Sequence, residues 1–436
     1  MATWVDLDDR SEEQGGTMKL RCGRILTCGL AVATGTGTLW LGPSAVAGAA
    51  TPTASPGVTA STITVGSISD ISAPIPGLFE GAKVGTQAYF DYINSQGGVN
   101  GRKLILDARD SAFSSGTVAS EAQSIAKSDF AFVGGYSLLD GAEQPAIDTN
   151  QVPMIAQTLT PSLSADPNLY SAIPTVNGGA GNGFFKWFKS QNPAAVKAVG
   201  FIGSNAAASA VASEKVYRNL TYNLGYKWVY SRDAGYTETN FLPDMIKMKS
   251  SGVKMVLEIT EGPTEISSMA QEMKQQGLNV PLVTGAGTYS KAFDPGSAGN
   301  GTLLYTSTAL YMGEDAKVIP AVGTFDKWAK TADPQTALDL FTLDGWINAQ
   351  LFVQALKNAG TDPTRASLVA QLNKVNSFNA SGLITAQNPA QKIPGQCWIV
   401  AKYTNGKWLR TSPDPKAAFV CNPKGFYPAS YKGIPR

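Results

Sequence analysis

The sequence predicts an α/β fold of two Rossmann-like lobes, each a parallel sheet flanked by helices, joined by a hinge. Short β-branched runs alternate with segments whose apolar residues recur every three or four positions, as expected for buried strands and amphipathic helices. The same alternation starts again near residue 196. Alternation at this pace requires crossover connections, and therefore parallel sheets with helices on both faces.

The first lobe begins with a β-branched run at 63–68 and a helix whose apolar positions include Ala82, Tyr89 and Ile93. This helix is expected to end at Gly97, because glycine favours helix ends. The remaining elements predicted for this part, in chain order, are strand 104–108, helix 118–126, strand 130–133, helix 142–149 and strand 152–156.

The second lobe repeats this pattern and is followed by a long amphipathic helix. Its predicted strands are 196–202, 227–232, 253–259 and 280–284, and its predicted helices are 213–224, 242–249 and 266–276. The long helix is expected at 342–359 and a shorter one at 365–375. A hairpin at 398–409 should turn on Asn405-Gly406, the pair typical of a type I′ turn.

The amino terminus is predicted to be a secretory signal over residues 1–49. A basic region from Met18 precedes the apolar stretch 25–41, and small residues at 45–49 fit an A-x-A cleavage site. The segment before Met18 is acidic, so Met18 is the expected start. The protein is therefore expected to be exported, to the periplasm or the outer face of the membrane.

Two alternatives to cleavage stay open. Residues 25–41 are close to the length of a membrane span, so a retained anchor is one of them. Lipid attachment at Cys28 is the other, although the residues before it match a lipobox poorly. Residues 50–61, rich in Thr, Ser, Pro and Ala, are expected to form a flexible leader.

The cysteines agree with export. Two of the four lie within the predicted signal, which leaves Cys397 and Cys421 as one expected disulfide that ties the carboxyl-terminal tail, 412–436.

Composition and motifs argue against most enzyme classes. The sequence has no histidine, which removes the commonest general base and zinc ligand. With 35 Lys and Arg against 33 Asp and Glu it has no basic field for nucleic acid. No dinucleotide fingerprint, phosphate loop or nucleophile elbow is present. We therefore predict no catalytic residue, no metal and no cofactor.

Two carboxylates lie close together in sequence at the end of a predicted strand. Glu258 and Glu261 flank Thr260 and are the best candidate pair for acid–base chemistry. We interpret them instead as groups that form hydrogen bonds to a ligand or across the cleft. Open parallel sheets bind ligands beyond the carboxyl ends of their strands, so two such lobes should enclose a cleft for a small molecule.

Several segments resemble one family. The segment 77–110, GLFEGAKVGTQAYFDYINSQGGVNGRKLILDARD, is similar to the first helix and second strand of type I periplasmic binding proteins. The GGVNGRK sequence at 97–103 is typical of the branched-chain amino-acid and amide group that supplies ABC importers. Segments 132–155, 239–256 and 269–283 also resemble this family, so the likeness extends over roughly 63–375.

The resemblance implies a receptor that captures a small organic solute, an amino acid or a related compound, and delivers it to the permease subunits of an ABC importer. It implies a lobe 1 of residues 62–174 plus about 306–375 and a lobe 2 of about 175–305 plus 376–411. It also implies a monomer peripheral to the outer face of the membrane. A ligand sensor of the same fold is the alternative, and an exported enzyme a further one.

The family's ligand loops map onto specific positions of this chain. The expected ligand-binding residues are Ser72, Tyr136, Ser137, Asp140, Gln157, Thr158, Thr160, Asn205, Ala207, Glu258, Glu261, Ala286 and Tyr289.

The chain departs from the amino-acid binders at two of these positions. Those relatives place an aromatic residue near Ala207 and an acid near Ala286, where the acid pairs with the ligand ammonium. Glu258 or Glu261 would have to supply the missing carboxylate and Tyr289 the aromatic wall, because an unpaired buried ammonium is costly. A larger or less polar solute is the alternative.

Overall fold

The computed structural model of the chain describes residues 55–72, 79–174, 179–205, 208–235, 238–413, 419–422 and 426–428. The predicted signal at 1–49 lies outside these residues. Within the described ranges, no helix has the length and hydropathy to cross a bilayer.

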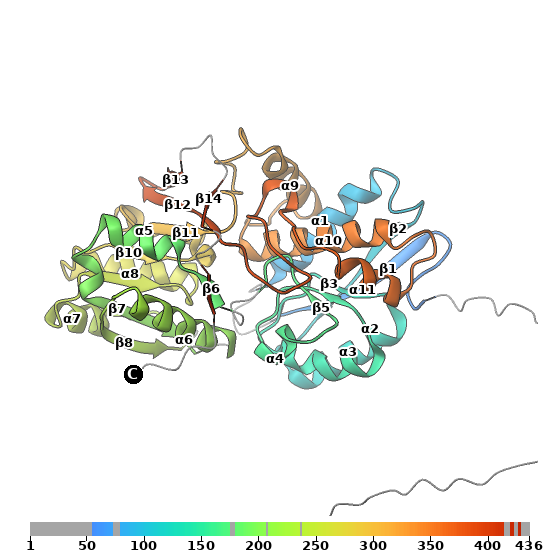
Figure 1. Cartoon of the computed structure of the whole chain (residues 1–436), viewed down its shortest axis with the longest axis horizontal. Helices are drawn as coiled ribbons and strands as arrows, with labels where there is room; N and C mark the ends of the chain where they lie inside the picture. The colour runs from blue at the N-terminus through green and yellow to red at the C-terminus, as the bar shows by residue number, and fades with distance from the viewer. Residues whose placement is uncertain are drawn as a thin grey trace, which may run out of the picture. The chain divides into compact units, whose positions relative to one another are not determined.

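The first sheet has five strands in the order β2-β1-β3-β4-β5, all parallel (Figure 1). Its strands are β1 (Thr62–Ser69), β2 (Lys103–Asp110), β3 (Phe132–Val133), β4 (Met154–Ile155) and β5 (Leu169–Tyr170). The strand order places β1 in the interior of the sheet, where both of its faces are covered. This agrees with its almost continuous run of buried residues.

Helices cover both faces of this sheet. On one face Ile63 and Val65 of β1 pack with apolar residues of α1 (Glu80–Asn94) and α10 (Leu340–Asn358). On the other face Ile68 packs with α2 (Ser115–Ser128) and α3 (Gln144–Asn150). Three further helices belong to this part of the chain: α4 (Pro161–Ser164), α9 (Pro320–Ala332) and α11 (Arg365–Leu372).

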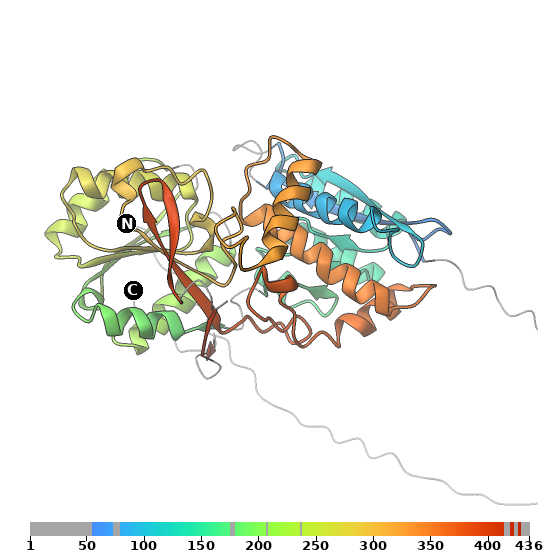
Figure 2. The ribbon, with the colours of Figure 1, turned by 90° about the horizontal axis from the view of Figure 1, so that it is seen from above.

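The second sheet has eight strands, with β13-β12-β11-β10-β9-β7-β8 in a row and β14 paired to β12. The strands β7 (Val199–Ser204), β8 (Trp228–Ala234), β9 (Met255–Glu258), β10 (Leu282–Thr284) and β11 (Leu303–Thr306) are parallel. The antiparallel hairpin β12 (Cys397–Thr404) and β13 (Lys407–Ser412) extends this sheet, and is drawn in red in Figure 2. Asn405 and Gly406 both have positive φ, as the predicted type I′ turn requires.

Helices also pack on both faces of the second sheet. Phe201 and Leu257 contact the aromatic residues of α5 (Gly183–Gln191) and the apolar side of α6 (Ala208–Asn223). Ile202 and Val256, one residue along each strand, pack with α7 (Leu242–Ser250) and α8 (Pro263–Gln275). Neighbouring strand residues face opposite sides, so the alternation of the two clusters follows directly from strand geometry.

The carboxyl-terminal segment is tied back in two places. Cys397 and Cys421 form the predicted disulfide, and β14 (Val420–Cys421) pairs with β12 at that point. Beyond it, β15 (Phe426–Pro428) pairs with β6 (Gly179–Gly181) as a separate two-stranded sheet. A segment more than 240 positions later in the chain therefore supplies the partner strand of β6.

The predicted alternation is confirmed, and three details differ from it. The strand expected at 196–202 begins at Val199, because Ala195–Lys197 form a 3-10 turn. The segment 376–393, expected with the second lobe, contacts first-lobe elements instead: Gln350 of α10 donates a hydrogen bond to Ser381, and Lys392 donates to the carbonyl of Ser164 at 3.2 Å. Among the elements that were not predicted are β5, β11 and α9.

Two glycines set the distance between α1 and α10, which lie side by side in Figures 1 and 2. A Cβ atom on Gly85 of α1 would lie 1.9 Å from the carbonyl oxygen of Thr342, and one on Gly345 of α10 would lie 2.1 Å from that of Ala82. Both obstacles are helix backbone, which cannot rotate away. The two helices can therefore pack at this distance only because neither residue has a side chain.

We predict that Gly345→Ala lowers the free energy of unfolding by about 3 kcal/mol, at the upper end of overpacking costs, because the two helices must move apart. The matched control is Gly323→Ala in α9, where a Cβ would meet nothing within 4 Å. That change should raise stability by up to about 1 kcal/mol, the helix preference of alanine. Urea unfolding of both variants tests this, and equal effects of the two changes would contradict it.

Candidate functional site

A cavity of about 460 Å³ lies where strands of both sheets end. Tyr136 and Gln157 follow β3 and β4 of the first sheet, while Thr260 and Ala286 follow β9 and β10 of the second. The carboxyl ends of the parallel strands therefore supply the cavity from both sides. This is the position that open α/β sheets use for ligands.

The first-lobe wall is apolar and largely aromatic. Phe79, Tyr136 and Phe341 form a cluster with ring centroids 4.6 to 4.9 Å apart. Leu138 and Leu159 pack against this cluster and also line the cavity. The three rings come from the residue before α1, the loop after β3 and the first turn of α10, so the fold brings together positions that are far apart in sequence.

The second-lobe wall continues the apolar surface. Phe184 stacks on Tyr305 with ring centroids 4.3 Å apart and planes 9° from parallel. Ile259 and Trp398 lie in the same lining. Gly183 allows the close approach of α5 to Trp398, since a Cβ there would lie 2.1 Å from the indole ring.

Buried carboxylates fix the first-lobe loops. Asp70, at the end of β1, accepts hydrogen bonds from the amide of Leu138 at 2.7 Å and the hydroxyl of Ser137 at 2.6 Å. Asp140 accepts from the amide of Leu159 and, at 3.4 Å, from that of Thr160. Each acid thus binds backbone N–H groups of a loop that forms the cavity wall.

Glu258 has the same role in the second lobe. Its Oε1 accepts hydrogen bonds from the amides of Thr260 at 2.7 Å and Glu261 at 2.8 Å, and from the Thr260 hydroxyl at 3.1 Å. The side chain is fully buried, and burial raises its pKa to about 7 although these bonds lower it. Glu258 therefore organises the loop after β9, and it does not line the cavity.

Glu261 is the acidic residue among the described residues that line the cavity. It is 5% exposed, and neither carboxyl oxygen has a hydrogen-bond partner within the described part of the chain. Burial, together with the negative charge of the nearby Glu258, raises its pKa to about 9. The neutral form of this carboxyl is therefore favoured at neutral pH.

None of the described residues that line the cavity is a lysine or arginine. The described residues also contain no cluster of three or more side chains suited to a metal ion. The lining therefore provides hydroxyl, amide and apolar groups rather than charges.

The structure divides the predicted site residues into two groups. Those that line the cavity are Tyr136, Gln157, Thr158, Glu261 and Ala286. Those that do not line it are Ser72, Ser137, Asp140, Thr160, Asn205, Glu258 and Tyr289. Ala207 lies outside the described residues.

Tyr289, expected as the aromatic wall, lies in the core of the second lobe. It is fully buried, its hydroxyl contacts Glu314 and its ring packs on Tyr311. Ser72 is exposed and hydrogen-bonds Asp110. Both residues occupy predicted loops, and their side chains are engaged with partners other than the cavity.

The aromatic lining was missed by sequence reasoning. Phe79, Phe184, Tyr305, Phe341 and Trp398 were not singled out, because each looks like an ordinary core residue in its own segment. The proximity of Trp398 to Cys397 is the one local signal that could have drawn attention to it.

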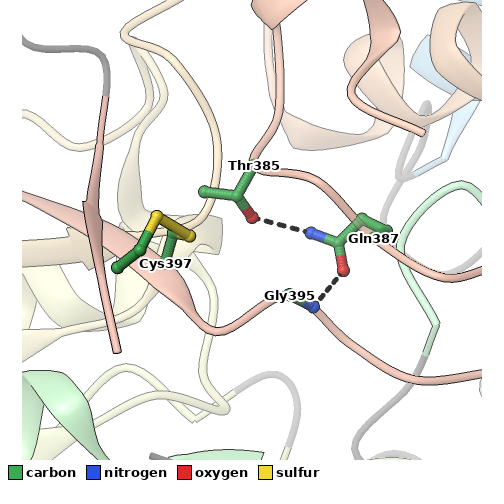
Figure 3. The surroundings of a disulfide bond; sticks show 5 residues. Thr385, Gln387, Gly395 and Cys397 are labelled. Atoms are coloured by element: carbon green, nitrogen blue, oxygen red, sulfur yellow. Dashed lines mark hydrogen bonds between the residues drawn. A yellow bond between two sulfur atoms is a disulfide. The ribbon is translucent and has the colours of Figure 1, made fainter. Parts of the chain in front are cut away.

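The chain crosses between the sheets beside the cavity, and Gln387 forms hydrogen bonds within the crossing segment that leads to β12. Its side chain donates to the hydroxyl of Thr385 at 2.9 Å and accepts from the amide of Gly395 (Figure 3). Gly395 leads directly to Cys397 and the disulfide. A Cβ on Gly395 would lie 2.5 Å from the Thr385 hydroxyl, so the close approach requires glycine.

The sequence matches the family described as "Periplasmic binding protein" over residues 62–407. No curated protein sequence shows a match.

Solved structures share the fold. A fatty acid ABC transporter substrate-binding protein from Thermomonospora curvata is 19% identical with a TM-score of 0.69, covering 84% of this chain and 96% of its own. A leucine-binding protein from Thermotoga maritima is 16% identical with a TM-score of 0.65, covering 83% and 99%. A branched-chain amino acid transporter substrate-binding protein from Streptococcus pneumoniae, in complex with isoleucine, is 16% identical with a TM-score of 0.64, covering 80% and 100%.

Glu261 should make the stability of the protein dependent on pH. The folded state binds this proton more tightly than the unfolded chain, whose carboxyl has the ordinary pKa of 4.5. The free energy of unfolding should therefore fall as pH rises from about 4.5 towards about 9. We predict that Glu261→Gln removes this loss, so the variant becomes more stable than the wild type as pH rises.

Urea unfolding of both proteins between pH 5 and about 9 measures the difference. We expect the difference in the free energy of unfolding to exceed about 1 kcal/mol at the highest pH of this range. This threshold is low, because a pKa shift of one unit alone corresponds to about 1.4 kcal/mol. Parallel stability curves over this range would contradict the assignment.

Proposed function

Because this chain belongs to the periplasmic binding protein family, we propose that it is an exported receptor that binds a small organic solute in its cavity and delivers it to an ABC importer. One observation supports this most directly: the strand ends of two parallel sheets line a single cavity of about 460 Å³. That volume suits an organic molecule of modest size. Its proposed partners are the permease subunits at the outer face of the membrane.

The relatives set the breadth of the proposal. The similar structures include a fatty acid transporter component and a protein in complex with isoleucine. From these relatives alone we propose only that the ligand is a small organic solute, and an amino acid is one candidate. At Ala286, where amino-acid binders place an acid, this chain lines its cavity with a methyl group.

A receptor gains stability from its solute, because the ligand binds the folded state and not the unfolded chain. We predict that one class in a panel of amino acids, amides, urea, aromatic acids and apolar metabolites raises the melting temperature. At a concentration of a hundred times Kd the gain is about 2.7 kcal/mol. Thermal unfolding with each solute measures it. If the protein converts a compound of the panel and none of the compounds stabilises it, the proposed receptor function is contradicted.

Thr158 is the residue with which we propose to test the first-lobe side of the site. It is 1% exposed and lines the cavity, and its hydroxyl lies 3.2 Å from that of Ser164. We predict that Thr158→Ala weakens binding of the stabilising solute roughly 2- to 10-fold, the effect of one lost hydrogen bond. Calorimetric titration measures the affinity.

The matched control is Thr331→Ala on the exposed side of α9, which should leave the affinity unchanged. A normal melting temperature without solute shows that Thr158→Ala has folded. Unchanged affinity in the folded variant would show that Thr158 does not contact the solute.

A further inference from the structure

We infer that the solute of this cavity is an uncharged, largely apolar molecule. The inference rests on the proposed receptor function and assigns the chemistry of its ligand. Three features of the described lining support it: the missing cations, the occupied amides of the first-lobe wall and the aromatic walls.

The lining offers little to a carboxylate. A buried anion needs a cation or several N–H donors, and no lysine or arginine is among the described lining residues. The amides of Leu138 and Leu159, on the first-lobe wall, already donate to Asp70 and Asp140. Neither of these two amides is free to bind a ligand carboxylate, and no described lining side chain is basic enough to neutralise one, so anionic solutes are disfavoured.

The lining also lacks a counterion for an ammonium group. Glu261 is the acidic side chain among the described lining residues, and its carboxyl oxygens are buried. Besides burial, the neighbouring Glu258, Glu265 and Glu238 favour its neutral form, and Arg232 opposes them. Arg232 is itself bonded to Glu238 and Asp244. A cationic solute would therefore enter without a charged partner.

Most of the remaining surface is apolar. The cluster of Phe79, Tyr136 and Phe341 forms one wall, and the Phe184–Tyr305 pair forms part of the other. Aromatic walls on both sides favour a solute with substantial apolar area, since burial of that area drives binding.

A series with a constant chain and a variable head group tests the inference. 1-Decanol, decanoate and decylamine are titrated into the purified protein at pH 7.5 below their aggregation limits, with leucine as the amino-acid arm. We expect decanol to bind at least tenfold more tightly than each of the other three. Tighter binding of decanoate, decylamine or leucine would overturn the inference and leave the receptor standing. A protein that binds none of these, and is stabilised by nothing in the wider panel, would overturn both.

Two variants locate the binding. Phe341→Ala removes one ring of the aromatic wall and should weaken decanol at least fivefold. Leu409→Ala removes a side chain that is 49% exposed on β13 and does not line the cavity, so it should leave the affinity unchanged. Circular dichroism confirms that both are folded. Equal decanol affinity in a folded Phe341→Ala variant would place the alcohol outside the cavity and overturn the inference.

Discussion

Buried backbone N–H groups need acceptors, and this requirement shapes the loops around the cavity. Three acids at the ends of strands or in the loops that follow them meet it. Asp70 accepts from Leu138, Asp140 from Leu159 and Thr160, and Glu258 from Thr260 and Glu261. Each loop thereby holds its conformation with an internal partner, whether or not a solute is present.

The acids within the loops hold the shape of the cavity wall, and the lining side chains determine its chemistry. Because the amides of Leu138, Leu159 and Thr260 bond to Asp70, Asp140 and Glu258, these three N–H groups are not free to meet a solute. The lining side chains are mainly aromatic and aliphatic, with hydroxyls and amides between them. The strand ends place the cavity, and the side chains at those ends decide what fits it.

The sequence predicted most strands of the two sheets. For the site, it predicted the loops but not which of their side chains face the cavity. Long elements such as β1 and α10, of eight and 19 residues, contain enough apolar residues to be recognised, whereas β5 and β11 have two and four residues and contain too few. For the site, the pattern identified the loop after β10, but it could not show that Ala286 faces the cavity while Tyr289 packs into the core. The direction in which a loop side chain points depends on tertiary contacts, which a local sequence pattern cannot predict.

The segments that cross between the sheets also form part of the cavity wall. Thr306 and Ser307 at one crossing and Gly395 to Trp398 at another are lining residues, and Gln387 bonds to the second of these segments. A solute that touches Trp398 therefore contacts a chain segment that connects the two sheets. Any preference of the solute for one arrangement of that segment is a preference for one arrangement of the sheets. A partner protein can distinguish the occupied from the empty form only through such a difference in affinity, because a solute that binds two arrangements equally well does not change their populations.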